Sequence, residues 1–162
     1  MRLAMRFTEG IISDLFWKPL KRFGDDRGWL GELFRQDELP EGFQVTMAYA
    51  SMTNPGVVRG PHEHVDQSDC FCFMGPGNFE LTLWDMRPGS ATHGVKQVEM
   101  VGVARPMLVI IPPRVIHAYK NSADGPGIVY NFPDRLYKGP GRTEPVDEIR
   151  HELDPHSIYQ VQ

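Results

Sequence analysis

The sequence predicts an all-β fold, a small barrel formed by a single domain of 162 residues. Glycine (16 residues) and proline (14 residues) recur along the chain and separate short β-rich runs at intervals of roughly ten residues, a pattern typical of sandwiches and barrels. His62 and His64 lie two residues apart and share a strand face, and His117 is expected to join them from a neighbouring strand. The sequence therefore indicates a barrel with three imidazoles directed into its interior.

Strands account for most of the expected secondary structure. The run Asn78–Trp84 alternates apolar and polar residues, as a half-buried strand does. The run Met107–Ile111 is apolar throughout and predicts a strand covered on both faces. Turn residues such as Asn54–Gly56 separate the runs. The only plausible helical turns fall at Asp147–Glu152. The expected strands are Gly31–Arg35, Gln44–Thr53, Cys70–Met74, Asn78–Trp84, Lys96–Met100, Met107–Ile111, Ile116–Lys120 and Ile128–Phe132.

Composition excludes several classes of partner. The net charge is −4, the pI is about 5.8 and no cluster of lysine and arginine forms a basic stripe, so no nucleic-acid partner is expected. No window is apolar enough for a membrane span or a signal peptide, so we expect no membrane partner and a cytoplasmic location. Cys70 and Cys72 are too close along a strand for a good disulfide, which predicts free thiols in a reducing compartment.

Two groups of residues resemble the two sequence motifs of the cupins. His62, His64 and Asp69 are similar to the first motif, which usually carries glutamate where this chain has aspartate. The second motif is matched by Pro112, His117 and Asn121. The resemblance implies a double-stranded β-helix, also called a cupin or jelly-roll barrel, with a short C-terminal tail or helix.

Four further features narrow the resemblance. They are the early run Asp25–Glu32, the run Arg59–His62, the run Pro112–His117, and Tyr130 thirteen residues after His117. Jointly they resemble the motifs of the dTDP-4-dehydrorhamnose 3,5-epimerase (RmlC-like) family, and the similarity extends over nearly the full chain.

The resemblance implies roles for individual residues. His62 would be the general base and Tyr130 the general acid, because a neutral imidazole with a pKa of about 6.5 can accept the acidified proton beside a keto group. Arg27 would contact a diphosphate, which its planar guanidinium suits, and Glu32 a nucleotide base. Arg59 would stabilise the enolate or hold a phosphate. Further expected substrate contacts are His117, Tyr49 and Tyr137.

The chain departs from the family pattern near its C-terminus. The C-terminal aspartate that orients the catalytic histidine in the family is absent. Asp69 and Asp134 are the two candidate carboxylates to replace it.

Three alternatives stay open. Because the epimerases typically lack a histidine at position 64, His64 also favours a sugar-nucleotide 3,4-ketoisomerase. A metal-dependent cupin enzyme would bind manganese, iron, nickel or zinc through His62, His64, Asp69 and His117. The third alternative is a sugar-binding cupin without catalysis.

We therefore expect an epimerase that acts without metal on a dTDP-4-keto-6-deoxyhexose, at C3 with C5 as the second candidate centre, in deoxysugar or cell-surface polysaccharide biosynthesis. The expected partners are a nucleotide sugar and a second copy in a homodimer. Residues 1–40 would supply N-terminal strands at the dimer interface, residues 41–137 the barrel core and residues 138–162 the C-terminal tail.

Overall fold

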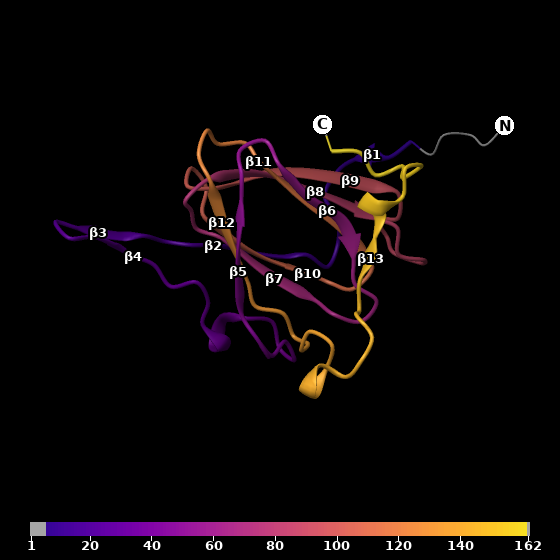
Figure 1. The fold of residues 1–162 in the computed structure, drawn as a ribbon, viewed down its shortest axis with the longest axis horizontal. Helices are drawn as coiled ribbons and strands as arrows, with labels where there is room; N and C mark the ends of the chain where they lie inside the picture. The colour runs from indigo at the N-terminus through magenta and orange to yellow at the C-terminus, as the bar shows by residue number, and fades with distance from the viewer. Residues whose placement is uncertain (1–5, 162) are drawn as a thin grey trace.

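The computed structural model describes residues 6–161 and consists of two β-sheets packed face to face (Figure 1). Residues 1–5 and 162, at the outer ends of the predicted N-terminal and C-terminal segments, lie outside the described residues. No helix in the part of the chain that the structure describes is long and apolar enough to span a membrane. The all-β fold predicted from the sequence is confirmed.

The first sheet has six strands and the second has five. In spatial order the first contains β1 (Thr8–Glu9), β9 (Val95–Gly102), β8 (Asn78–Asp85), β11 (Val115–Asn121), β6 (Val58–Glu63) and β13 (Ile149–Arg150). The second contains β2 (Phe16–Pro19), β10 (Met107–Ile111), β7 (Asp69–Phe73), β12 (Gly127–Asn131) and β5 (Tyr49–Thr53). A separate hairpin of β3 (Phe23–Asp25) and β4 (Gly28–Leu30) projects from the barrel (Figure 1).

The main hydrophobic core lies between the two sheets. Alternate residues of each strand point inward, so Phe71 and Phe73 of β7 meet Leu81 and Leu83 of β8 and Tyr119 of β11 in one buried cluster. The intervening residues of the second sheet face outward into a separate outer cluster. This outer cluster contains Cys70, Cys72, Leu108 and Ile110 with Leu20, Met74, Phe43 and Phe132, and partly buried side chains including Leu33, Phe34 and Tyr130 pack against it.

Several expected elements differ from those observed. Gly31–Arg35 is not a strand, because Leu33 and Phe34 reach the outer cluster from an irregular segment and need no strand partner. The predicted helical turns at Asp147–Glu152 are also wrong, since Ile149–Arg150 pairs with β6 as a strand. Short 3-10 turns occur at Gln36–Glu38, Pro140–Arg142 and His151–Leu153. β10 has the predicted bounds and is buried along its whole length.

The turn after β8 is held by a buried carboxylate. Asp85 accepts hydrogen bonds from the guanidinium of Arg87 at 2.9 and 2.8 Å and from the hydroxyls of Ser90 and Thr92, each at 2.6 Å. These contacts outweigh the opposing effect of burial and lower the pKa of Asp85 below its usual value. The ionised form of Asp85 therefore stabilises the fold.

Replacing Asp85 tests this contribution. We expect Asp85→Asn to reduce the free energy of unfolding by about 2 to 4 kcal/mol at pH 7, because the amide lacks the charge and replaces one of the two acceptor oxygens with an NH₂ donor. Since the folded pKa is depressed, the difference from wild type is complete above about pH 4 and narrows as the pH falls further. Urea unfolding from pH 7 to pH 3 measures this, with the exposed Asp124→Asn as the matched control. A pH-independent difference would contradict the assignment.

Candidate active site

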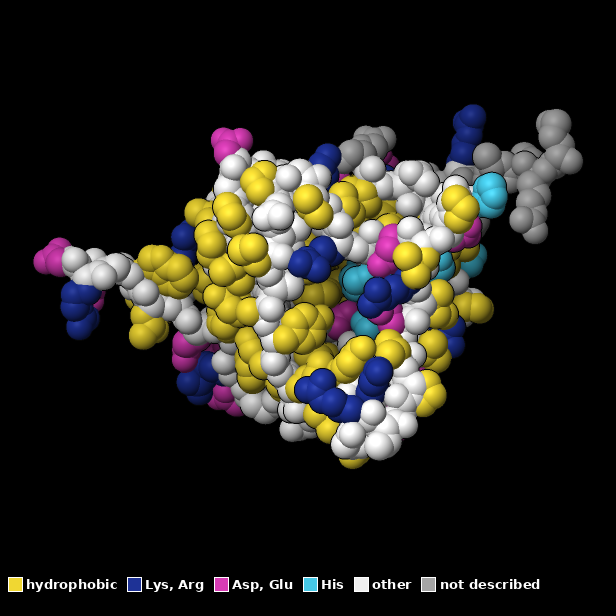
Figure 2. Space-filling model, viewed as in Figure 1, with side chains coloured by type: hydrophobic (Ala, Val, Ile, Leu, Met, Phe, Trp, Pro, Cys, Tyr) yellow, Lys and Arg dark blue, Asp and Glu magenta, His cyan; other side chains and the backbone are white. Residues whose placement is uncertain are grey.

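A cavity of about 700 Å³ opens at one end of the barrel. This volume is typical of a small-molecule site. Figure 2 shows the hollow at the centre of the view, with histidine and acidic side chains in its floor and lysine and arginine around it. The residues that line its inner part include Tyr49, Ser51, Arg59, His62, His64, Gln67, Phe71 and Tyr119.

Strand alternation brings the three predicted histidines together. His62 on β6 is the register partner of His117 on β11, and their ring centroids lie 4.5 Å apart. His64 follows directly after β6, and its ring centroid lies 5.8 Å from that of His62. His117 is only 1% exposed and lies in the wall behind the cavity, whereas His62 and His64 line the cavity itself.

Asp69, at the start of β7, is the buried carboxylate beneath these rings. Its Oδ2 atom lies 3.2 Å from Nε2 of His64 and 3.2 Å from Nε2 of His117. Its Oδ1 atom accepts hydrogen bonds from the amides of Gln67 at 3.0 Å and Asn131 at 2.8 Å. Although burial alone would raise the pKa of Asp69, the two imidazoles and their charge hold it well below the usual value. Asp69 is therefore an ionised group inside the protein.

The two histidines that line the cavity differ in charge because their surroundings differ. Burial, and then the neighbouring His117, lower the pKa of His62 to about 2, so its imidazole is neutral at physiological pH. Burial also opposes the charged form of His64, but Asp69 and the Asp147 carbonyl raise the pKa of His64 to about 9. His62 therefore has a free lone pair for proton abstraction, whereas His64 is charged.

Glu148 is a site residue that the sequence analysis missed. Its Oε1 atom lies 3.9 Å from Nδ1 of His62, and both side chains are 15% exposed. Arg150 donates to the other Glu148 oxygen at 2.6 Å. Glu148 comes from the segment expected to be helical, so only the pairing of β13 with β6 reveals its position.

Asp147 fixes this C-terminal segment against the site. Its carboxylate accepts the backbone N–H groups of Val65, Asp66 and Gln67 at 2.9, 3.0 and 2.8 Å, and its carbonyl contacts Nδ1 of His64. These N–H donors lower the pKa of Asp147 against the effect of burial. The arrangement closes one wall of the cavity, and no motif in the sequence signals it.

Basic side chains surround the cavity. The guanidinium of Arg59 is held by the Thr53 hydroxyl at 2.9 Å and the Met52 carbonyl at 2.6 Å. The other basic residues that line the cavity are Arg135, Lys138, Arg142 and Arg150. Several arginines near one hollow suit an anionic ligand with more than one charge.

The remaining predicted site residues divide into two groups. Tyr49 and Tyr137 line the cavity, as Arg59 does. Tyr130 does not, because it lies on the opposite strand face from Asn131 and packs against the outer cluster. The expected position of its phenol in the pocket is therefore not observed.

Of the four other predicted site residues, which are the two candidate carboxylates and the two residues at the hairpin, only Asp69 contacts the histidines. Asp69 contacts His64 and His117, whereas Asp134 accepts the backbone N–H of Ser68 at 2.8 Å and is not among the cavity residues. Arg27, at the tip of the projecting hairpin, pairs with Asp25, and Glu32 lies just beyond it. Neither Arg27 nor Glu32 lines the cavity of its own chain.

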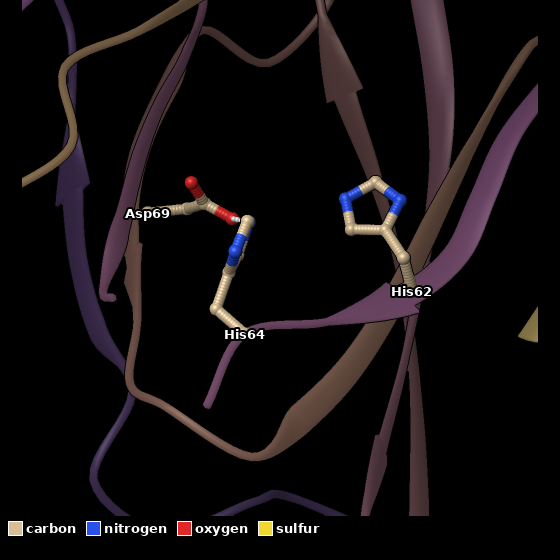
Figure 3. Close-up of side chains that lie close together, drawn as sticks. All are labelled: His62, His64 and Asp69. Carbon is tan, nitrogen blue, oxygen red and sulfur yellow. Dashed lines mark ion pairs between the residues drawn. The ribbon is translucent and has the colours of Figure 1, made fainter. Parts of the chain in front are cut away.

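Among the described residues, His62, His64 and Asp69 also have the geometry to hold a metal ion. One ligand atom from each lies within 4.8 Å of the others. Figure 3 shows the His64 ring beside Asp69, with His62 facing both from the neighbouring part of the strand.

Comparisons with known proteins agree with this architecture. The family model for dTDP-4-dehydrorhamnose 3,5-epimerase matches residues 9–145. The spore coat polysaccharide biosynthesis protein SpsL of Bacillus subtilis is 36% identical over 149 residues, covering 91% of this chain and 94% of SpsL. The probable low-salt glycan biosynthesis epimerase Agl13 of Haloferax volcanii is 32% identical over 126 residues, covering 78% of this chain and 81% of Agl13.

Solved structures share the fold. A dTDP sugar isomerase from Desulfovibrio desulfuricans superposes with a TM-score of 0.79 at 22% identity, covering 93% of this chain and 91% of that one. An epimerase from Legionella pneumophila in complex with dTDP-4-keto-L-rhamnose gives a TM-score of 0.73 at 21% identity, covering 96% and 82%. The predicted double-stranded β-helix is thus confirmed. With the family match and the two relatives above 30% identity, these findings establish that the chain belongs to the dTDP-4-dehydrorhamnose 3,5-epimerase family of sugar epimerases.

Proposed function

We propose that the chain epimerises a nucleotide-linked 4-keto-6-deoxyhexose, with a dTDP sugar as the expected substrate and C3 as the first centre. The observation that carries this proposal is the neutral His62 in the cavity, with Glu148 3.9 Å from its Nδ1 atom. The 4-keto group acidifies the C3 proton, and the imidazole accepts it. Glu148 then stabilises the imidazolium that forms, because a carboxylate beside a protonated ring lowers its energy.

The basic residues support a nucleotide sugar as the substrate class. Arg59, Arg142 and Arg150 line the same cavity as His62, so a diphosphate bound by them leaves its sugar near the base. The Legionella relative is described in complex with dTDP-4-keto-L-rhamnose, which is a ligand of this kind. The two free cysteines, Cys70 and Cys72, fit a reducing compartment and support a cytoplasmic location.

Tyr49 is the phenol we propose as the proton donor. Its hydroxyl oxygen accepts a hydrogen bond from the Asn131 amide at 2.8 Å, which leaves its own hydrogen available to a substrate. Burial raises the pKa of Tyr49, so the phenol stays protonated. Tyr119 also lines the cavity, but its hydroxyl is hydrogen-bonded to Ser51 at 2.9 Å.

We also propose a homodimer in which the projecting hairpin packs against a second copy. Phe23, Trp29 and Leu30 of the hairpin are 60%, 53% and 66% exposed. An isolated two-stranded ribbon is only marginally stable, and an exposed apolar patch commonly marks an interface. Such a dimer offers Arg27 and Glu32 a cavity other than their own. We propose that Arg27 contacts the diphosphate and Glu32 the base in the cavity of the second copy.

Proton exchange tests the base. We expect His62→Ala to abolish incorporation of deuterium at C3 of dTDP-4-keto-6-deoxyglucose in D₂O, because no other neutral imidazole lines the cavity in the described residues. Proton NMR of chelator-treated protein follows the C3 and C5 signals and the product. His156→Ala, an exposed change in the tail, is the control.

The wild-type result separates the candidate functions. Exchange at C3 with an inverted product supports the epimerase, and additional exchange at C5 makes it a 3,5-epimerase. A product with its keto group at C3 would instead identify a 3,4-ketoisomerase. Absence of exchange in the wild type would leave a sugar-binding protein, and full exchange in His62→Ala would remove His62 as the base.

A pair of tyrosine variants tests the proton donor. We expect Tyr49→Phe to lower product formation by about 10² to 10⁴ while exchange at C3 persists, since a general acid contributes on that scale. Tyr130→Phe is the matched control and should remain within about twofold, because its side chain packs outside the cavity. Steady-state rates measure product formation, and NMR measures proton exchange at C3. The opposite pattern would restore Tyr130 as the acid that its spacing predicts.

Light scattering tests the dimer. We expect Trp29→Asp to shift the protein from dimer to monomer in size-exclusion chromatography with light scattering, because a charge replaces an apolar contact. Leu153→Asp is the control, since Leu153 is 73% exposed at a different place on the chain. A wild-type monomer, or a Trp29→Asp dimer, would contradict the proposed arrangement.

A further inference from the structure

The segment that carries Glu148 is joined to the barrel by a very short strand. β13 contains two residues and runs beside β6 at the edge of the first sheet, and its register partners are Ile149 with Glu63 and Arg150 with His62 (Figure 1). Strands usually contain about five to six residues, so this ladder supplies few hydrogen bonds. The position of Glu148, directly before β13, therefore depends on contacts at both ends of the strand.

Side chains anchor the segment on both sides of Glu148. On the N-terminal side, the Asp147 carboxylate accepts the three backbone N–H groups of the turn at 65–67. On the C-terminal side, Nε2 of His151 lies 2.9 Å from Oε1 of Glu63, and both side chains are partly buried. Glu148 thus lies between two anchors that join the C-terminal segment to β6 and to the turn that follows it.

The second anchor lies on the outer face of the first sheet. Glu63 and His62 are neighbours on β6 and face opposite sides, and only His62 lines the cavity. The ring centroid of His151 lies 4.7 Å from that of Tyr159, which in turn lies 5.7 Å from the buried ring of Trp84. Glu63 and His151, the outer pair, are therefore packed against the sheet and do not line the cavity.

The contact between Glu148 and His62 is sensitive to the position of this segment. Oε1 of Glu148 lies 3.9 Å from Nδ1 of His62, which is longer than a hydrogen bond, and Arg150 donates to the other oxygen at 2.6 Å. A displacement of about 1 Å caused by a change remote from the chemistry can lower a rate by about 100-fold. A small movement of the segment therefore decides whether the carboxylate reaches the ring.

We propose that the outer pair positions the Glu148 carboxylate against His62. The pair acts through the backbone, because His151 follows β13 directly and its contact with Glu63 fixes the end of that strand. Glu63 and His151 are thus positioning residues, since neither lines the cavity. The catalytic part of this proposal rests on the proposed function, whereas the effect on the His62 ring does not.

Nitrogen NMR of the His62 ring tests the outer pair without substrate. We expect His151→Ala to shift the Nδ1 signal of His62 in the same direction as Glu148→Gln does, because a carboxylate beside Nδ1 favours the hydrogen on that nitrogen. Leu153→Ala is the matched control, an exposed change in the same 3-10 turn, and should leave the signal unchanged. Glu63→Ala serves as a second variant if His151→Ala unfolds.

Proton exchange at C3 tests the consequence for catalysis. We expect His151→Ala to slow exchange by about 10-fold to 100-fold in the wild-type protein, and by less than about twofold in a Glu148→Gln background, because the outer pair acts through Glu148. His151→Gln, whose amide still donates to Glu63, should recover most of the lost rate.

The two measurements separate this proposal from the proposed function. An equal loss of exchange in both backgrounds, or an unchanged His62 signal in His151→Ala, would overturn the positioning role of the outer pair. Absence of exchange in the wild type would overturn the proposed function, and the His62 signal would then decide the role of the outer pair by itself.

Discussion

A buried carboxylate, Asp69, is the constraint around which the site is organised. An ionised group that is 1% exposed requires compensation from every side, and here it comes from two imidazoles and two side-chain amides. These partners come from β11, β12 and the segment between β6 and β7. Because both sheets contribute, the carboxylate also ties the two halves of the barrel together at the end where the cavity opens.

This constraint divides the histidines by role. His64 and His117 face Asp69 and are committed to it, whereas His62 is left with Glu148 on one side and the cavity on the other. A single protein region thus holds a charged imidazole and a neutral one within 5.8 Å, measured between ring centroids. Such separation of two similar groups by their surroundings leaves His62 neutral, and so able to accept a proton, at a pH at which His64 is charged.

The sequence was informative wherever local patterning decides the structure. Met107–Ile111 is a buried strand, as a short apolar run between turn residues predicts. His62 faces His117 because alternate residues of a strand share one face and the two histidines are register partners on neighbouring strands. Gly31–Arg35 failed as a strand because Leu33 and Phe34 cover the outer cluster without pairing, which depends on the rest of the fold. Spacing alone could not show which face of β12 carries Tyr130, and in the structure its neighbour Asn131 contacts Asp69 while Tyr130 packs against the outer cluster.

Glu148 and Asp147 were beyond sequence reasoning because their contacts span more than 80 residues of chain. The Asp147 carboxylate is bound by three backbone N–H groups and by none of the corresponding side chains. The side chains of Val65 and Asp66 can therefore vary while the turn still anchors the wall of the cavity, provided that proline, which lacks the N–H group, is avoided there. Gln67 is constrained separately, because its amide donates to the buried Asp69 carboxylate. Asp147 is thus the residue whose side chain this contact requires, whereas Val65 and Asp66 contribute to it only through their backbone.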